Sequence, residues 1–126
     1  MVILCDTKDK QNSHIIDELD NQKIAHKSKS LKTGDYSFMI KACPELGFQY
    51  DTYFTDELCV ERKNSLDELA GNLANKSDDN RIFKEFNRMI NIERVYLLIE
   101  NNKIDDIFTH KYRSEYNPDS FIRTLL

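Results

Sequence analysis

The chain has few of the residues that build fibrous, irregular or membrane-spanning proteins. Only three glycines and two prolines occur in 126 residues, which excludes collagen-like, low-complexity and loop-dominated architectures. No apolar run approaches the roughly 20 residues that a membrane-spanning helix needs. The first six residues, MVILCD, become charged too early for a secretory signal peptide. These absences predict a globular protein without a membrane segment, and the length suits one compact domain over residues 1–126.

Cysteine content and net charge narrow the class further. The three cysteines are an odd number without Cys-x-x-Cys spacing, which argues against a disulfide framework or a zinc site and favours a reducing, intracellular compartment. The 18 basic and 22 acidic residues give a net charge of −4. That balance excludes a uniformly basic nucleic-acid coat protein, but it is compatible with acidic side chains that hold a metal ion.

Apolar patterns predict strands that alternate with helices, and therefore an α/β layered fold. The expected strands cover residues 2–5, 23–31, 36–40, 58–63 and 95–99, and the expected helices begin near residues 13, 65, 81 and 118. The first of these helices has Asn12 or Ser13 available as its cap. Residues 23–31 are polar, as in an outer strand, whereas 95–99 give the strongest signal for a buried strand. Residues 41–56 read as an elongated loop or hairpin tip, and the hairpin-connected strands before residue 63 predict a mixed sheet.

Helix-end signals support these boundaries. Ser65 and Glu68 have the spacing of a capping box, and Asn117-Pro118 reads as an N-cap followed by proline at the first helical position. The polar residues 76–80 should end the helix that opens at Ser65. The helix over 81–92 should bury one apolar face, which consists of Ile82, Phe83, Phe86, Met89 and Ile90.

The last helix is still apolar where the sequence stops. Its apolar residues are Phe121, Ile122, Leu125 and Leu126. Because such residues favour burial, the natural domain is expected to continue beyond Leu126, or this surface is expected to pair with another molecule.

Charged residues near strand ends form the constellation that carries chemistry. Side chains alternate along a strand, so Glu61 and Lys63 project to one side while Arg62 points to the other. Asp35 stands at a strand start and Asp6 at a strand end. Carboxylates beside an amine suit a divalent cation with its bound water, since Mg²⁺ prefers oxygen ligands. The alternative is a solvated charged surface, which acid-x-Lys spacing alone does not exclude.

These residues resemble the signature of a known nuclease family. GDY at 34–36, and VERK at 60–63 followed by Asp67, are similar to the GDx…ERKxxxD signature of the XPF family of structure-selective endonucleases. That family belongs to the PD-(D/E)XK superfamily. The resemblance extends to Arg81, which begins a helix, and to the strand that ends in LIE at 98–100. It implies a restriction-endonuclease-like mixed central sheet flanked by helices.

The resemblance also implies an activity and a role for each matched residue. The activity is metal-dependent hydrolysis of phosphodiester bonds in branched or flap DNA during repair, recombination or replication. Asp35 and Glu61 would ligate Mg²⁺ or Mn²⁺, together with the backbone carbonyl of Arg62. Lys63 would position the attacking water, and Asp6 would lie beside the metal or orient the other groups.

Further matched positions have supporting roles or open alternatives. Asp67 would also lie beside the metal or orient its ligands, and the Arg62 side chain would brace the strand through an acidic partner. Arg81 would contact DNA phosphate or hold Asp67, with plain solvent exposure as the alternative. Lys8 and Asp9 stand where the family's first motif has Arg-Glu, so the resemblance assigns no role to those two positions.

Two surface segments have both a functional and a structural interpretation. Lys23, Lys27, Lys29 and Lys32 form a basic strip that would track DNA phosphates, or would protect an edge strand from aggregation. The four aromatic residues of the next loop would stack on unpaired bases or pack the hairpin onto the domain; they are Phe48, Tyr50, Tyr53 and Phe54.

Partners and location follow from the same resemblance. The tandem helix-hairpin-helix DNA-binding module common in the family is absent from this sequence, so tight DNA binding should need a homodimer, a heterodimer or a further segment. The C-terminal helix is the expected dimer interface, and branched, flap or junction DNA is the expected ligand. The expected location is the cytoplasm of a bacterium or phage-infected host, or the nucleus in a eukaryote. A non-catalytic partner subunit or DNA-binding module of the same fold is the alternative function.

Overall fold

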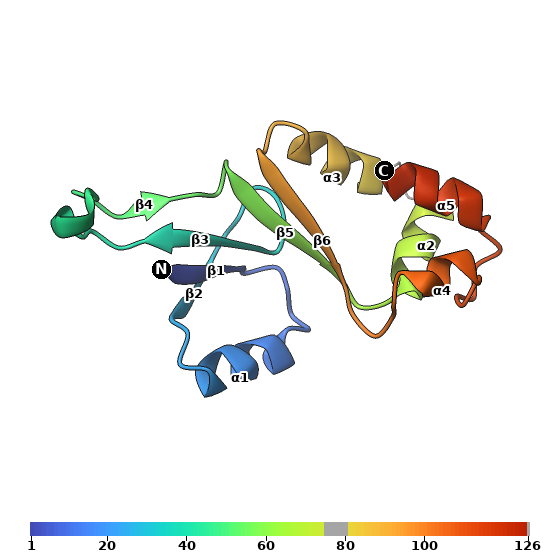
Figure 1. Cartoon of the computed structure of the whole chain (residues 1–126), viewed down its shortest axis with the longest axis horizontal. Helices are drawn as coiled ribbons and strands as arrows, with labels where there is room; N and C mark the ends of the chain where they lie inside the picture. The colour runs from blue at the N-terminus through green and yellow to red at the C-terminus, as the bar shows by residue number, and fades with distance from the viewer. Residues whose placement is uncertain (75–80, 126) are drawn as a thin grey trace. The chain divides into compact units, whose positions relative to one another are not determined.

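The computed structural model describes residues 1–74 and 81–125. Its internal contacts divide the chain into two compact units, and each unit is made of two separate segments. The first, which we call the sheet unit, comprises Met1–Glu61 and Arg88–Tyr96. The second, the helix unit, comprises Arg62–Asn87 and Leu97–Leu126. Figure 1 gives the labels of the helices and strands.

The strands form one mixed sheet, as the sequence predicts. Their order is β2-β1-β3-β5-β6, with β4 paired to β3. β1 runs parallel to β2 and antiparallel to β3, and β3 runs antiparallel to β5. The strands are β1 (Val2–Asp6), β2 (His26–Lys29), β3 (Tyr36–Ile40), β4 (Thr52–Tyr53), β5 (Leu58–Lys63) and β6 (Arg94–Ile99). The mixed sheet and the helices confirm the predicted α/β class.

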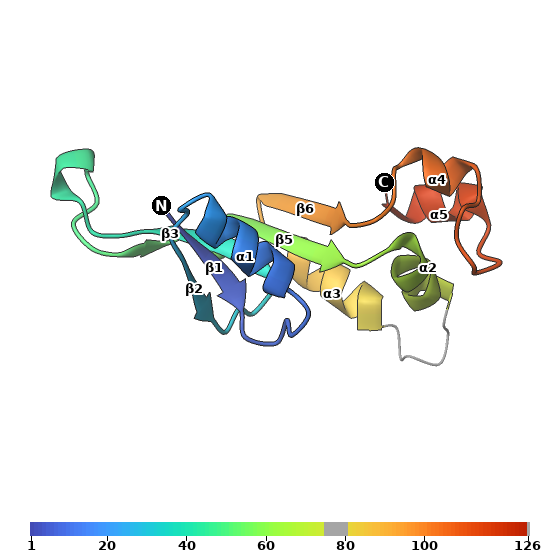
Figure 2. The same ribbon diagram turned by 90° about the horizontal axis from the view of Figure 1, so that it is seen from below.

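The sheet unit buries a small apolar cluster. Val2, Leu4, Leu31 and Met39 form it, and Leu4 and Met39 are fully buried. Helix α1 (Ser13–Asn21) links β1 to β2, with Asn12 at its N-cap position but without a capping hydrogen bond from that side chain. Figures 1 and 2 show the hairpin of β3 and β4 extending from the other strands of this unit. A short 3-10 helix, η1 (Pro44–Leu46), lies at its tip, which confirms the predicted hairpin.

The two edges of the sheet are both largely exposed, and they differ in polarity. β2 is a polar edge strand, which confirms the prediction for that segment. β6 is also an edge strand within the described residues, and Val95, Tyr96 and Leu98 are 42%, 54% and 45% exposed. The prediction that this segment is the most buried strand is therefore wrong. An apolar run identifies a strand, but only strand order decides whether neighbours cover it.

The helix unit has its own apolar core. Its helical elements are α2 (Leu66–Ala74), most of α3 (Arg81–Met89), α4 (Asp105–Phe108) and α5 (Pro118–Leu125). The buried residues of this core are Leu66, Leu69, Ala70, Leu73, Ile82, Ile107, Tyr112 and Phe121. The predicted apolar stripe of α2 is thereby confirmed. Burying these side chains provides most of the driving force for folding this unit.

Side chains cap two of the helices as the sequence predicts, although one capping hydrogen bond is shifted by one residue. The Ser65 hydroxyl accepts a hydrogen bond from the Glu68 amide at 3.2 Å. The Glu68 carboxylate accepts from the Asn64 amide at 2.7 Å, one residue earlier than a standard capping box requires. The Asn117 side chain accepts from the Ser120 amide at 3.2 Å, which confirms the N-cap of α5.

Two predictions about helical surfaces need correction. Helix α3 ends at Met89, three residues early, and Phe83 and Ile90 are 42% and 77% exposed, so its apolar face is narrower than predicted. Phe121 is fully buried in the helix-unit core, so it is not available as the centre of a dimer interface on the last helix. The predicted helix break at 76–80, and Leu126, lie outside the described residues.

No helix among residues 1–74 and 81–125 combines the length and apolar character needed to cross a bilayer.

Candidate active site

Strand β5 presents its charged residues in strict alternation. Cys59, Glu61 and Lys63 are 0%, 9% and 8% exposed, while the residues between them are only partly buried. Glu61 and Lys63 therefore share one face of the strand, and Arg62 occupies the other. This confirms the alternation expected from the sequence and places an acid and an amine on the buried side of β5.

Backbone hydrogen bonds bring Asp35 to β5 within the sheet unit. The Asp35 amide donates to the Val60 carbonyl at 2.8 Å, and the Asp6 amide donates to the Asp35 carbonyl at 2.8 Å. Gly34 makes this approach possible, because its φ is +76° and a Cβ there would lie 3.0 Å from the Cβ of Cys59. The end of β1, the start of β3 and the middle of β5 therefore meet, as the placement of these acids requires.

The pKa of the Cys59 thiol is influenced by both carboxylates. Its pKa is raised to about 11, chiefly by burial and in smaller part by the negative charges of Glu61 and Asp35. Both carboxylates therefore act on the same buried sulfur atom. This common influence agrees with the backbone hydrogen bond that places Asp35 beside Val60, the residue before Glu61.

The donor chemistry of this neighbourhood fits a hard divalent cation. In the described ranges, no group of three or more His, Cys, Asp or Glu side chains is arranged to hold a metal ion. Mg²⁺, however, is commonly held by one or two carboxylates and keeps several waters. Asp35 and Glu61 supply carboxylates of that kind, and the backbone carbonyl of Arg62 remains a predicted further ligand.

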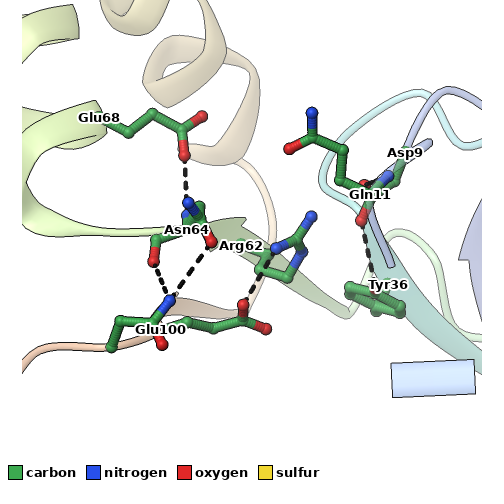
Figure 3. Close-up of polar contacts among 8 residues, drawn as sticks. Asp9, Gln11, Tyr36, Arg62, Asn64, Glu68 and Glu100 are labelled. Atoms are coloured by element: carbon green, nitrogen blue, oxygen red, sulfur yellow. Dashed lines mark hydrogen bonds and ion pairs between the residues drawn. The ribbon is translucent and has the colours of Figure 1, made fainter. Parts of the chain in front are cut away.

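Asp6 has a structural contact in the sheet unit. It is 7% exposed, and its Oδ1 accepts a hydrogen bond from the Leu31 amide at 2.9 Å. This bond fixes the chain where it leaves β2, 25 residues later in the sequence. A role for Asp6 beside a metal ion stays a prediction. Asp9, at a position where the sequence departs from the family motif, accepts from the Tyr36 hydroxyl at 3.1 Å (Figure 3).

In the helix unit, the two residues that follow β6 brace the end of β5. Arg62 pairs with Glu100 at 3.2 Å, with side chains 7% and 18% exposed (Figure 3). The Glu100 amide also donates to the Lys63 carbonyl at 2.9 Å. The Asn101 side chain donates to the Asn64 carbonyl at 2.9 Å. These contacts confirm the predicted acidic partner of Arg62 and identify it as Glu100.

Lys63 contacts a carboxylate that the sequence analysis missed. Its Nζ lies 3.9 Å from Oε2 of Glu85 on α3. A polar pocket of about 140 Å³ adjoins this pair, and it is lined by Lys63, Glu68, Asn72, Arg81, Ile82 and Glu85. Arg81 therefore lines the same pocket as Lys63. Glu85 follows Arg81 by four residues on a helix, so their shared face was the available sequence signal.

Asp67 has a different partner from the one considered. Its Oδ1 accepts a hydrogen bond from the Arg113 amide at 2.6 Å, and its Oδ2 lies 3.8 Å from Nε of the same residue. Arg113, rather than Arg81, is thus the arginine that holds Asp67 within the part of the helix unit that the structure describes. Nothing in the sequence links residues 46 positions apart, so this contact was not predictable.

The basic strip and the aromatic loop meet at Tyr53. Lys27 and Lys29, on β2, place their ammonium groups 5.4 Å and 4.8 Å from the ring centroid of Tyr53. Phe54 stacks on Phe38 with ring centroids 4.7 Å apart, which supports hairpin packing for that residue. Tyr50 is 81% exposed. Lys32 is exposed, as are Lys27 and Lys29.

Comparisons with known proteins find a family model and a solved structure that are similar to this chain. The family model described as the ERCC4 domain matches residues 5–126. A comparison with curated proteins finds no match. Among solved structures, XPF from Aeropyrum pernix is similar, with a TM-score of 0.63 and 21% identity. That match covers 99% of this chain and 49% of the other, so this chain spans about half the length of that structure. At this identity the likeness establishes a shared fold.

Proposed function

Because the chain belongs to the ERCC4 domain family, a family of DNA endonucleases, we propose that it is a metal-dependent nuclease that cuts branched or flap DNA. The observation that carries this proposal is the hydrogen bond from the Asp35 amide to the Val60 carbonyl at 2.8 Å, which places Asp35 beside the residue that precedes Glu61. The influence of both carboxylates on the pKa of the Cys59 thiol supports the same placement. Lys63, two residues after Glu61 on the same face of β5, completes the set.

Asp35 and Glu61 would hold Mg²⁺ or Mn²⁺, with the Arg62 carbonyl as a further ligand. The ion, when bound, acidifies a coordinated water and neutralises charge that builds on the phosphate. Both carboxylates are oxygen donors on adjoining segments of the sheet unit, which is the donor type that these ions prefer. Asp6 would support them from the end of β1, where its backbone is bonded to Asp35.

Lys63 would orient the attacking water. Its ammonium group has three donors, and its backbone is fixed because its carbonyl accepts from Glu100. The water oxygen would form a bond to phosphorus while the bond from phosphorus to the 3′ oxygen breaks. The leaving oxygen gains a proton, which gives ends with a 5′-phosphate and a 3′-hydroxyl.

The DNA would be held by basic side chains outside the carboxylate neighbourhood. Arg81 lines the pocket beside Lys63, and Lys27 and Lys29 lie on an edge strand, with Lys32 just beyond it. Each lysine or arginine that contacts a phosphate adds salt-dependent affinity. Four such residues give weak binding, so we propose that a second subunit or a further segment supplies the rest.

The test is cleavage of labelled duplex, single-stranded, flap and junction DNA with Mg²⁺ or Mn²⁺. The Glu61→Gln, Asp35→Asn and Lys63→Ala variants should each lose about 100-fold or more in rate, because each removes a group at the reacting centre. The matched control is Glu57→Gln, because Glu57 is an exposed acid immediately before β5. This variant should cleave DNA at the wild-type rate. Cleavage that survives in all three variants would remove these residues from the mechanism.

A non-catalytic partner subunit is the second candidate. The exposed apolar side chains of β6, Val95, Tyr96 and Leu98, favour it, because monomeric proteins seldom expose an apolar edge strand. If the wild type cuts none of the substrates at high protein concentration but binds flap DNA, the chain acts as such a subunit. Metal-dependent cutting by the purified chain would exclude this role.

A further inference from the structure

Lys63 and Glu85 form an ion pair that is largely shielded from solvent. Their charged atoms are 3.9 Å apart, and their side chains are 9% and 26% exposed. Both residues line the polar pocket of the helix unit together with Arg81. Glu85 is thus a carboxylate within ion-pair distance of the lysine used in the proposed reaction.

Helix α3 holds Glu85 in a fixed orientation. Ile82, three residues earlier, is 4% exposed and belongs to the helix-unit core. Phe86, the next residue, packs against the same core. Because both neighbours are anchored, the face of the helix that carries Glu85 cannot rotate freely. A carboxylate mounted on a packed helix positions its partner more accurately than one on a loop.

The length of the contact indicates how it acts. A direct hydrogen bond between an ammonium and a carboxylate is about 2.7–2.9 Å long, whereas this separation is 3.9 Å. Glu85 therefore attracts the Lys63 charge across a distance longer than a hydrogen bond. Such an attraction favours one position of the ammonium group without occupying one of its three hydrogen-bond donors.

We propose that Glu85 is a positioning residue for Lys63. It holds the ammonium group at the end of β5, where Lys63 orients the attacking water. Glu85 acts through Lys63 and does not touch the substrate. This inference rests on the proposed function and adds to it one residue from α3, outside the GDY and ERK segments.

The activity test uses the full chain and a double-mutant cycle. Glu85→Gln keeps the shape of the side chain but removes its charge, and it should lower kcat on flap DNA about tenfold with KM unchanged. Glu85→Asp restores a carboxylate and should recover part of the rate. In a Lys63→Ala background, Glu85→Gln should have no further effect. Additive losses in the cycle would overturn the proposal.

A second measurement does not depend on cleavage. NMR relaxation of the Lys63 Nζ should report a lower order parameter in Glu85→Gln than in the wild type, with Glu85→Asp in between. Glu93→Gln is the control, since Glu93 pairs with Arg94 at 3.7 Å on the surface, with side chains 69% and 67% exposed. It should change neither the Lys63 signal nor the rate.

The two measurements separate the two ideas. If the wild type cuts no DNA, the proposed nuclease function fails, while the NMR comparison still decides whether Glu85 holds Lys63. An unchanged Lys63 order parameter in Glu85→Gln overturns the positioning role, even where the wild type is an active nuclease.

Discussion

The sheet unit and the helix unit arrange charged side chains around β5 in different ways. In the sheet unit, two like charges, Asp35 and Glu61, both act on one buried thiol. In the helix unit, the charges near the end of β5 are matched with opposite ones, as Arg62 is with Glu100 and Lys63 with Glu85. Strand β5 passes from the first environment to the second between Glu61 and Arg62.

This difference separates two tasks. Like charges gathered in one place shift pKa values and attract cations, which suits a metal site. Opposite charges in contact fix geometry and resist change, which suits the orientation of a single reacting group. The comparison therefore predicts that substitutions in the helix unit act through structure and positioning, and that substitutions in the sheet unit act through electrostatics.

The largest expected effect comes from the core of the helix unit. Phe121→Ala removes a fully buried ring that contacts Tyr112 and Tyr116, and it should cost about 3–5 kcal/mol of unfolding free energy. Urea denaturation measures the loss, and amide hydrogen exchange shows where it falls. Exchange should rise in α2 and α5 more than in β1 and β3. Equal loss of protection in both sets would show that the units unfold together.

An intermediate effect is expected at the pair that braces β5. Glu100→Gln replaces the charged partner of Arg62, which is 7% exposed, and should destabilise the chain by about 2 kcal/mol. Thermal unfolding at low and high salt measures it, and the loss should persist in high salt because the pair is shielded. Glu93→Gln breaks a surface pair and should change stability by less than about 0.5 kcal/mol. Similar losses in the two variants would contradict the structural role.

The smallest expected effect is a loss of stability at alkaline pH that arises from Cys59 in the sheet unit. The Cys59 pKa is about 11 in the folded protein against 9.0 for an ordinary cysteine, so between these values the folded state keeps a proton that the unfolded state loses. Stability should therefore be full below pH 9 and fall, by about 1–2 kcal/mol, as pH rises through the folded pKa.

Difference measurements isolate this effect from other alkaline titrations. In chelator-treated samples, the unfolding free energy of Cys59→Ala should decline less steeply with rising pH than that of the wild type. Cys43→Ala is the control. Glu61→Gln should also flatten the decline, because it removes a charge that raises the Cys59 pKa. A decline as steep in Glu61→Gln as in the wild type would place that carboxylate away from the thiol.

Local sequence patterns predicted much of the fold, and they predicted which side chains of β5 share a face. The alternation of Cys59, Glu61 and Lys63 follows from strand geometry, and the caps at Ser65 and Asn117 follow from short-range hydrogen bonding. The GDY and ERK segments could also be joined, because their spacing resembles a family whose fold brings them together. The family model that matches residues 5–126 confirms that assignment.

Contacts between distant segments were not predictable in the same way. The exposure of β6 depends on the strand order of the sheet, which an apolar run such as VYLLI does not encode. Glu85 and Arg113 find their partners through the packing of helices against the core of the helix unit. Phe121 looked available for a second subunit because hydrophobicity alone does not say which surface a side chain covers.

The interleaved boundaries of the two units bear on how the chain can be dissected and made. The sheet unit needs Arg88–Tyr96 in addition to Met1–Glu61, and the helix unit needs both Arg62–Asn87 and the segment from Leu97 onward. No single cut therefore yields one intact unit. During synthesis, the first 61 residues leave the ribosome well before the segment that completes their own unit. Fragment expression should thus give incomplete folds, and the polypeptide is best studied whole.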